Sequence, residues 1–147
     1  QRKILQSNFL PIFIGCLVGS TVSMVSAYGL CELFGLGDQV ALSTLPKSTT
    51  APIALAVTGE LGGTASITMA AVMTTGVMGA IFSPMLANLF HIKNKEAQGV
   101  AIGTCSHAVG TAKALEMGKL EGAMSGVAIA VSGLLTCFIV IAATSIM

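Results

Sequence analysis

The chain has 147 residues, of which 54% are hydrophobic and 9% are charged, and its mean hydropathy is +0.89. Because a soluble domain carries roughly 25% charged residues, this composition excludes an ordinary water-soluble fold and indicates a membrane protein. Seven basic and six acidic side chains leave a net charge of +1. No basic run is long enough to neutralise a nucleic-acid backbone, so no nucleic-acid partner is expected.

Runs of 28, 32 and 26 residues without Asp, Glu, Lys or Arg divide the chain. A spanning helix needs roughly 20 apolar residues, so each run suffices for one crossing. The predicted membrane helices cover residues 9–34, 65–90 and 123–146. The predicted fold class is therefore all-α, a single polytopic membrane domain over residues 1–147. Its other two segments are expected to be broken or re-entrant helices.

The first broken segment is expected over residues 42–63. Pro46 and Pro52 flank Lys-Ser-Thr-Thr-Ala, and a continuous helix through them would lose backbone hydrogen bonds. The second is expected over residues 93–121, where Gly103 and Gly110 surround a polar stretch. In a bilayer, irregular backbone survives only inside protein or along a watery cavity. Function is therefore expected in these two segments.

The two segments resemble each other. A shift of 60 positions places Ala51-Pro-Ile-Ala-Leu55 on Thr111-Ala-Lys-Ala-Leu115 and Gly62 on Gly122. In both copies a broken segment precedes one clean span, which suggests an internal repeat. Chance similarity between two Gly- and Ala-rich segments is the alternative.

The basic residues constrain topology. If Arg2, Lys3, Lys93, Lys95 and Lys119 all face the cytoplasm, an even number of membrane crossings must separate Lys3 from Lys93. The two clean spans between these residues already give an even number. Both broken segments are then re-entrant, and the two repeats are inverted, as in many transporters. If both segments cross fully instead, the repeat is parallel and the charge rule is broken once.

Lys47 is the first candidate binding residue, at the mouth of a predicted helix start. Ser48, Thr49 and Thr50 can cap this helix, and Pro52 is tolerated in a first turn. A helix N-terminus attracts carboxylate or phosphate, so the group is typical of an anion site. The alternative is a capped helix whose lysine extends to the lipid headgroups.

The second candidate group lies in residues 103–118. Lys113 would supply charge to an anion, Ser106 and Thr111 hydroxyls, and His107 a hydrogen bond or a proton relay. Glu116 is three residues from Lys113 and can share a helix face with it, so a self-neutralising pair is the alternative. Either His107 or Glu116 could couple protons. Glu60 is a further proton-coupling candidate, or only the end of a hairpin.

Enzymatic and metal functions are not expected. Ser106 and His107 are adjacent in sequence without an evident third member, which argues against a nucleophile and base. The four cysteines lack CxxC pairing and are expected as small buried packing residues, with no disulfide, metal site or cofactor. Gly spacing of four residues indicates close helix packing within one subunit, and a homo-oligomer is the alternative.

Several motifs together resemble the CidB/LrgB family of bacterial membrane proteins, to which the plastid glycolate/glycerate translocator domain is related. They are Leu45-Pro-Lys-Ser-Thr-Thr-Ala-Pro-Ile-Ala54, Gly62-Gly63, Gly76-Val-Met-Gly-Ala-Ile-Phe82, Gly103-Thr-Cys-Ser-His-Ala-Val-Gly-Thr-Ala112, Ala114-Leu-Glu116 and Glu121-Gly-Ala123. The resemblance covers nearly the whole chain, which is similar to the C-terminal two-thirds of longer family members. This sequence departs from the family pattern at two positions. Ala51 stands where Thr is usual, and Lys113 stands where many members have Arg. An arginine would bind a carboxylate through two hydrogen bonds, which a lysine cannot do.

The resemblance implies two competing functions in the bacterial cytoplasmic membrane. One is transport of a small carboxylate anion of the pyruvate, glycolate or glycerate class, with a small holin-like companion of the CidA/LrgA type. The other is an antiholin or holin-like control of murein hydrolase activity and autolysis. Two broken segments with cations and hydroxyls favour the carrier, because a pore needs amphipathic spans that assemble.

Overall fold

The computed structural model describes the backbone of residues 2–144 and the side chains of residues 9–143. Every described element is a helix. The helices are α1 (Arg2–Leu33), α2 (Asp38–Thr44), α3 (Ala51–Glu60), α4 (Ala65–Leu89), α5 (Lys95–Met117) and α6 (Lys119–Thr144). The all-α prediction is therefore confirmed.

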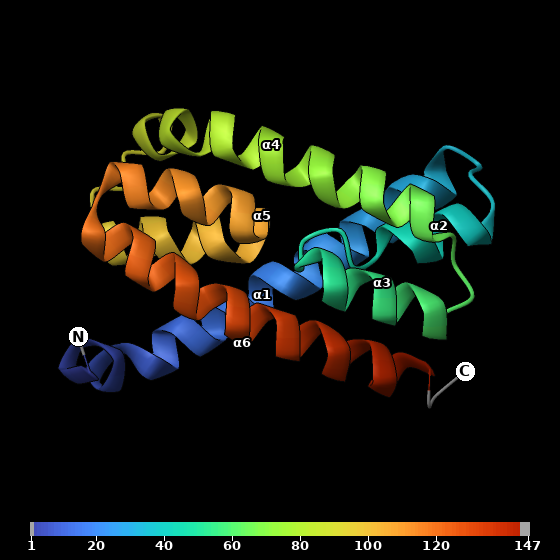
Figure 1. Ribbon diagram of the computed structural model, residues 1–147, viewed down its shortest axis with the longest axis horizontal. Coiled ribbons are helices and arrows are strands. Elements are labelled where there is room, and N and C mark those ends of the chain that lie inside the picture. The colour runs from blue at the N-terminus through green and yellow to red at the C-terminus, as the bar shows by residue number, and fades with distance from the viewer. Residues whose placement is uncertain (1, 145–147) are drawn as a thin grey trace.

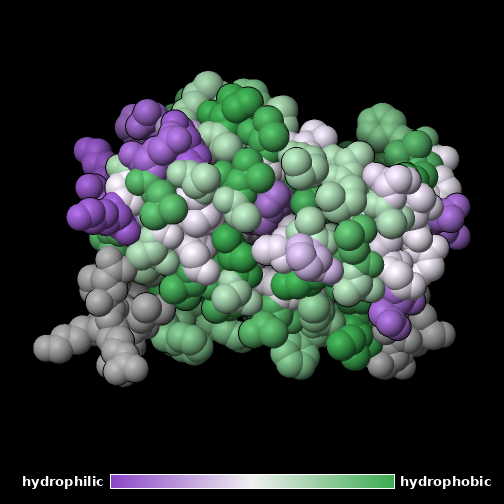
Figure 2. Space-filling view, in the orientation of Figure 1, coloured by the Kyte–Doolittle hydropathy of each residue, from purple (hydrophilic) through white to green (hydrophobic). Residues whose placement is uncertain are grey.

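Three helices are long and apolar enough to cross a bilayer. Their candidate spans are Phe9–Leu33, Ala65–Leu89 and Lys119–Ala143, which confirms the three predicted crossings, although residues 145 and 146 lie outside the described part. In Figure 1 α1, α4 and α6 run along the long axis, with α4 in the opposite direction to the other two. Hydrophilic residues gather mainly at the two ends of this axis, and hydrophobic residues cover most of its middle (Figure 2).

α2 and α3 form the first hairpin, in the segment where a break was predicted. Their 7 and 10 residues rise about 10 and 15 Å at 1.5 Å per residue, well short of a hydrocarbon core of about 30 Å. Neither arm is long enough to cross alone, and the chain reverses between them (Figure 1), as expected of a re-entrant hairpin. The turn at residues 45–50, called the first tip, contains Lys47 and points toward the middle of the molecule (Figure 1).

α5 forms the second hairpin, although its 23 residues are continuous in sequence. His107 has φ 42° and ψ −140°, which breaks the helix. The first arm, residues 95–106, places Gly99 against Glu121 and Met124, and the second, residues 108–117, places Leu115 against Gly122. Both arms therefore lie beside the start of α6, and the chain reverses at His107, called the second tip. A break in this segment was predicted and is confirmed.

The two hairpins enter from opposite ends of the molecule. In Figure 1 the α2–α3 hairpin enters from the right and the α5 hairpin from the left, and both tips point to the centre. Each hairpin is followed by one long helix, α4 or α6, and these two helices run in opposite directions. This is the arrangement expected of the inverted repeat. Arg2 and Lys3, used in the topology argument, lie outside the described side chains.

Candidate functional site

Lys47 is held at the first tip by hydroxyl groups. Its Nζ atom donates to the Oγ atom of Ser23 on α1 at 2.7 Å, and Ser23 shares a second hydrogen bond of 2.7 Å with the Oγ atom of buried Ser48. The lysine side chain is half-buried. The first tip, to which it belongs, points toward the middle of the molecule (Figure 1).

The charge of Lys47 lacks a negative partner among the side chains the structure describes, since its hydrogen bond is to a neutral hydroxyl. Lys113 differs: its Nζ atom lies 2.8 Å from Glu116 Oε2, on an exposed part of α5. The self-neutralising pair envisaged for Lys113 is therefore present. In the described part of the chain the two lysines share no partner, since Lys47 donates to Ser23 and Lys113 donates to Glu116.

The N-terminus of α3 at the first tip is also suited to an anion, but its capping differs from the prediction. Thr50 is the N-cap of α3 and Pro52 lies in the first turn, as expected, yet no side chain caps the helix. The hydroxyl of Thr49 donates to the Pro46 carbonyl at 2.9 Å instead, and that of Ser48 is engaged with Ser23. The capping prediction was wrong because other acceptors and donors compete for these hydroxyls. The first N–H groups of α3 are thus left without side-chain partners.

The second tip packs tightly against α4. The Nε2 atom of His107, a buried residue, lies 2.9 Å from the Val72 carbonyl. A Cβ at Gly76 would lie 2.5 Å from the imidazole, and one at Gly79 would overlap the Ser106 side chain. The two glycines of the Gly-Val-Met-Gly motif therefore make room for the second tip.

The remaining predicted site residues lie farther along the hairpins. Thr111 donates from Oγ1 to the His107 carbonyl at 3.0 Å and contacts Ser125 Oγ at 2.7 Å, so it braces the second hairpin against α6. Glu60 is exposed at the end of α3, and Glu116 is exposed beside Lys113. Of the three proton-coupling candidates, His107 alone lies at a tip.

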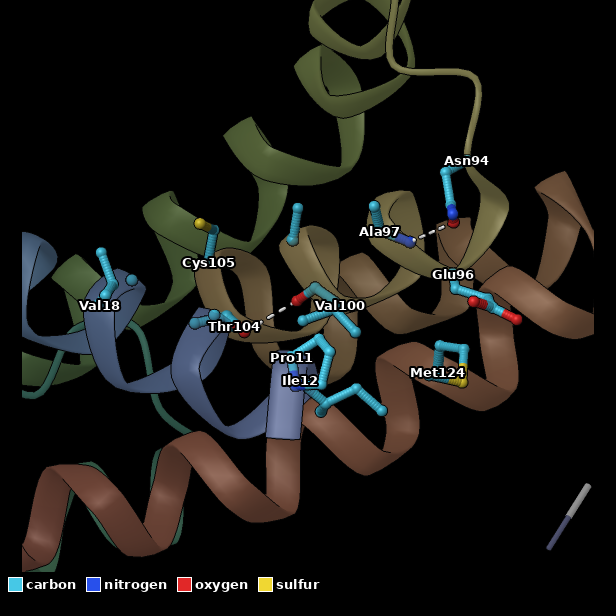
Figure 3. Close-up of a pocket in the computed structure, with 13 residues that line it drawn as sticks. Pro11, Ile12, Val18, Asn94, Glu96, Ala97, Val100, Thr104, Cys105 and Met124 are labelled. Carbon is cyan, nitrogen blue, oxygen red and sulfur yellow. Dashed lines mark hydrogen bonds between the residues drawn. The ribbon is translucent and has the colours of Figure 1, made fainter. Parts of the chain in front are cut away.

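The two tips point toward each other (Figure 1). The charge of Lys47 is near enough to Cys105, two residues before His107, to influence it electrostatically. Cys105 also lines a groove of about 510 Å³ between α1 and the first arm of α5, together with Gly15, Gly19 and Thr104 (Figure 3). The prediction of four buried cysteines is wrong here: Cys16 and Cys31 are buried, Cys137 is half-buried and Cys105 is exposed. All four are free thiols.

Sequence reasoning missed Ser23 and Cys105 as parts of the site. A polar residue within an apolar span was the available signal for Ser23, but its partner is 24 positions away. Glu121 was also not considered for a function: its carboxylate is almost fully buried and lies 3.7 Å from Lys95 Nζ. That pair joins the start of α5 to the start of α6, away from the tips.

The comparisons with known proteins agree on one family. The family model of the LrgB-like family matches residues 1–146. The chain is 39% identical over 138 residues to the uncharacterized protein YxaC of Bacillus subtilis, covering 94% of this chain and 60% of that relative. It is 32% identical over 140 residues to the holin-like protein CidB of Staphylococcus epidermidis, covering 95% of this chain and 61% of that relative.

The chain thus spans about three-fifths of the length of the curated relatives it matches. No solved structure gives a significant match.

Proposed function

This chain belongs to the LrgB-like family, and we propose that it carries small organic monocarboxylate anions across the bacterial cytoplasmic membrane. The observation that supports the proposal best is Lys47, a half-buried cation without a described acidic partner at the tip of a re-entrant hairpin. A charge inside the membrane costs roughly 3 kcal/mol or more. A visiting carboxylate would offset that cost, whereas a permanent acidic partner would compete with the ligand.

The neighbouring groups suit a carboxylate. The uncapped N-terminus of α3 presents N–H groups and a partial positive charge. The hydroxyls of Ser23, Ser48 and Thr49 surround the turn, and Thr50 adds another. A carboxylate that replaces Ser23 as the acceptor of the ammonium hydrogen bond would gain a charge-assisted hydrogen bond, which is stronger than a neutral one.

The second hairpin would form the other side of the binding site. Ser106, His107 and Thr111 supply polar groups there, and His107 is the proton-coupling residue we favour because it is buried at the tip. Lys113 would act less directly, since Glu116 already pairs with it. A small holin-like membrane protein of the CidA/LrgA type is the proposed companion.

Uptake of labelled pyruvate and glycolate into proteoliposomes tests the proposal. Uptake should be saturable, and Lys47→Gln should lower the initial rate about tenfold or more, because loss of one charge-assisted hydrogen bond costs about 1.5–3 kcal/mol. Lys113→Gln is the matched control and should lower the rate less. Equal rates for Lys47→Gln and the unchanged protein would exclude the Lys47 site.

The holin-like alternative is favoured by the name of the CidB relatives. A pore would release a trapped dye in proportion to protein density and would not saturate with substrate. Dye leakage without saturable uptake would therefore replace the carrier proposal with this alternative.

A further inference from the structure

Ser23 reaches the first tip from α1 through its hydroxyl group. Two neighbouring hydroxyls of α1 bond within the helix instead, since Thr21 and Ser26 donate to carbonyls four and three residues earlier. Such bonds to the preceding turn are common for Ser and Thr in helices. The Oγ atom of Ser23 lies 2.7 Å from Lys47 Nζ and 2.7 Å from Ser48 Oγ. The Ser23 hydroxyl therefore joins α1 to the first tip.

The direction of the contact with Lys47 follows from the chemistry of the two groups. An ammonium group can only donate hydrogen bonds, so the Ser23 oxygen is the acceptor. The side chain of Lys47 is half-buried, and a charge that is partly removed from water needs a hydrogen-bond partner. Ser23 supplies that partner without adding a negative charge. The ammonium group is thus hydrogen-bonded and still keeps its net charge.

A carboxylate can displace a serine oxygen from this position. Its oxygen carries a negative charge that a hydroxyl lacks, so it adds Coulomb attraction to the hydrogen bond with the ammonium. An aspartate at position 23 would provide the same attraction permanently and would compete with any anion from outside. Serine is therefore strong enough to hold the ammonium of Lys47 and weak enough to yield to a carboxylate.

Ser23 keeps a second partner in such an exchange. Its hydrogen bond of 2.7 Å with Ser48 does not involve the ammonium group, and Ser48 is buried at the first tip. One hydroxyl of this pair donates and the other accepts. A hydroxyl left without any partner in a buried place is costly. The serine pair avoids that cost when the ammonium turns to an anion.

We propose that Ser23 is a positioning residue that accepts the hydrogen bond of the Lys47 ammonium until a small carboxylate takes its place. Ser23 acts through Lys47, so it sets the affinity for the anion by competing with it. The inference rests on the proposed function, because it concerns the regulation of the same Lys47 site. Binding of the anion would also remove one of the contacts between α1 and the first tip.

Thermal unfolding of the purified protein in detergent, at increasing pyruvate concentration, tests the exchange without requiring transport. Pyruvate should raise the melting temperature, and the concentration needed for a fixed rise scales with its Kd. Ser23→Ala should lower that concentration about threefold to tenfold, because a competing hydrogen bond is removed. Ser23→Asp should abolish the response, because the new carboxylate would pair with Lys47. Ser23→Thr keeps the hydroxyl and should respond like the unchanged protein.

Thr21→Asp is the control for an acidic side chain in α1. Thr21 is exposed and lies roughly 200° around the helix from Ser23, so its replacement would face away from the first tip and should keep the pyruvate response. A merely structural role of Ser23 would weaken the response in Ser23→Ala as well as in Ser23→Asp. An unchanged or higher pyruvate requirement in Ser23→Ala would therefore overturn the proposal, as would a response retained in folded Ser23→Asp. If Ser23→Asp does not fold, the direction of the change in Ser23→Ala decides.

Uptake into proteoliposomes separates this inference from the carrier function. Saturable uptake with the same KM in Ser23→Ala and the unchanged protein would keep the carrier and remove the exchange. Melting responses that change as expected, without any uptake, would keep the exchange at Lys47 and remove the carrier. Neither a melting response nor uptake in the unchanged protein would remove both.

Discussion

Gly79 shows how a residue without a side chain shapes the candidate site. The space of its missing Cβ is filled by the Ser106 side chain, and Gly76 on the preceding turn receives the His107 imidazole in the same way. The closest contact between α4 and the second tip therefore depends on two glycines. Their spacing in the sequence was visible, but only the fold reveals which residues occupy the space.

Gly79→Ala should destabilise the protein, because its methyl group would overlap Ser106. Overpacking of this kind costs about 1–3 kcal/mol, and the melting temperature in detergent should fall accordingly. Gly29→Ala on α1 is the control: nothing lies within 4 Å of the position that its Cβ would occupy, and alanine favours a helix by about 0.5–1 kcal/mol. Equal melting temperatures for the two variants would contradict the packing at the second tip.

At the residue scale, the sequence identified candidates but could not rank them. Lys47 and Lys113 are both lysines in broken apolar segments, and the ion pair of Lys113 with Glu116 was already suggested by their spacing of three residues. The contact of Lys47 with Ser23 joins residues 24 positions apart. Local spacing cannot predict such a contact, because it depends on how α1 packs against the first tip.

His107 determines the shape of a whole element. Its φ of 42° with ψ of −140° lies in a region that is costly for residues other than glycine. The flanking Gly103 and Gly110 correctly indicated a break, yet the reversal falls on a histidine between them. The Nε2 contact with the Val72 carbonyl explains why: an interaction made only in the folded protein holds the backbone in that conformation.

His107→Gly and His107→Val should separate the backbone from the imidazole. Glycine adopts the observed φ readily, so His107→Gly should lose only the imidazole interaction, about 1 kcal/mol, and remain monodisperse in size-exclusion chromatography. Valine is β-branched and unfavourable at positive φ, so His107→Val should aggregate or melt at a clearly lower temperature. Similar behaviour of the two variants would show that the reversal does not depend on this backbone conformation.

The two hairpins are expected to open toward opposite sides of the membrane. Asp38 and Glu60 are exposed at the two ends of the first hairpin, while Lys93 and Lys119 are exposed near the two ends of the second. Cysteines at 38 and 60, in a protein lacking its native cysteines, should react with an impermeant maleimide from one side only. Cysteines at 93 and 119 should react only from the other side.

Labelling of positions 38 and 60 from opposite sides would mean that the first hairpin crosses the membrane. Ser43 and Gly63 are less suitable probes. Ser43 is fully buried and accepts a hydrogen bond from the Thr64 N–H, and a side chain at Gly63 would approach Ser43.

At the scale of the whole molecule, equivalent positions of the internal repeat occupy equivalent places in the fold. The shift of 60 positions that aligned the two segments also places Lys47 on His107, and these are the residues at the two tips. It places fully buried Thr68 of α4 on fully buried Ala128 of α6. The number and order of elements were predictable from charge-free runs and prolines. That the two tips point toward each other was not predictable, because it depends on how the two halves are arranged in space.

Crosslinking tests directly whether the two tips meet. Lys47→Cys introduces a thiol opposite the native Cys105, with which Lys47 interacts electrostatically, and the other native cysteines are replaced. A short bifunctional thiol reagent should join the two positions in the membrane and block uptake, since both tips would be fixed. A cysteine at position 93 is the control, because it precedes α5, whose residues 95–105 alone extend about 15 Å along the first arm. If the reagent joins 93 to 105 as readily as 47 to 105, or joins neither, the two hairpins do not meet at their tips. The anion site between them would then lose its geometry, whatever the role of Lys47 alone.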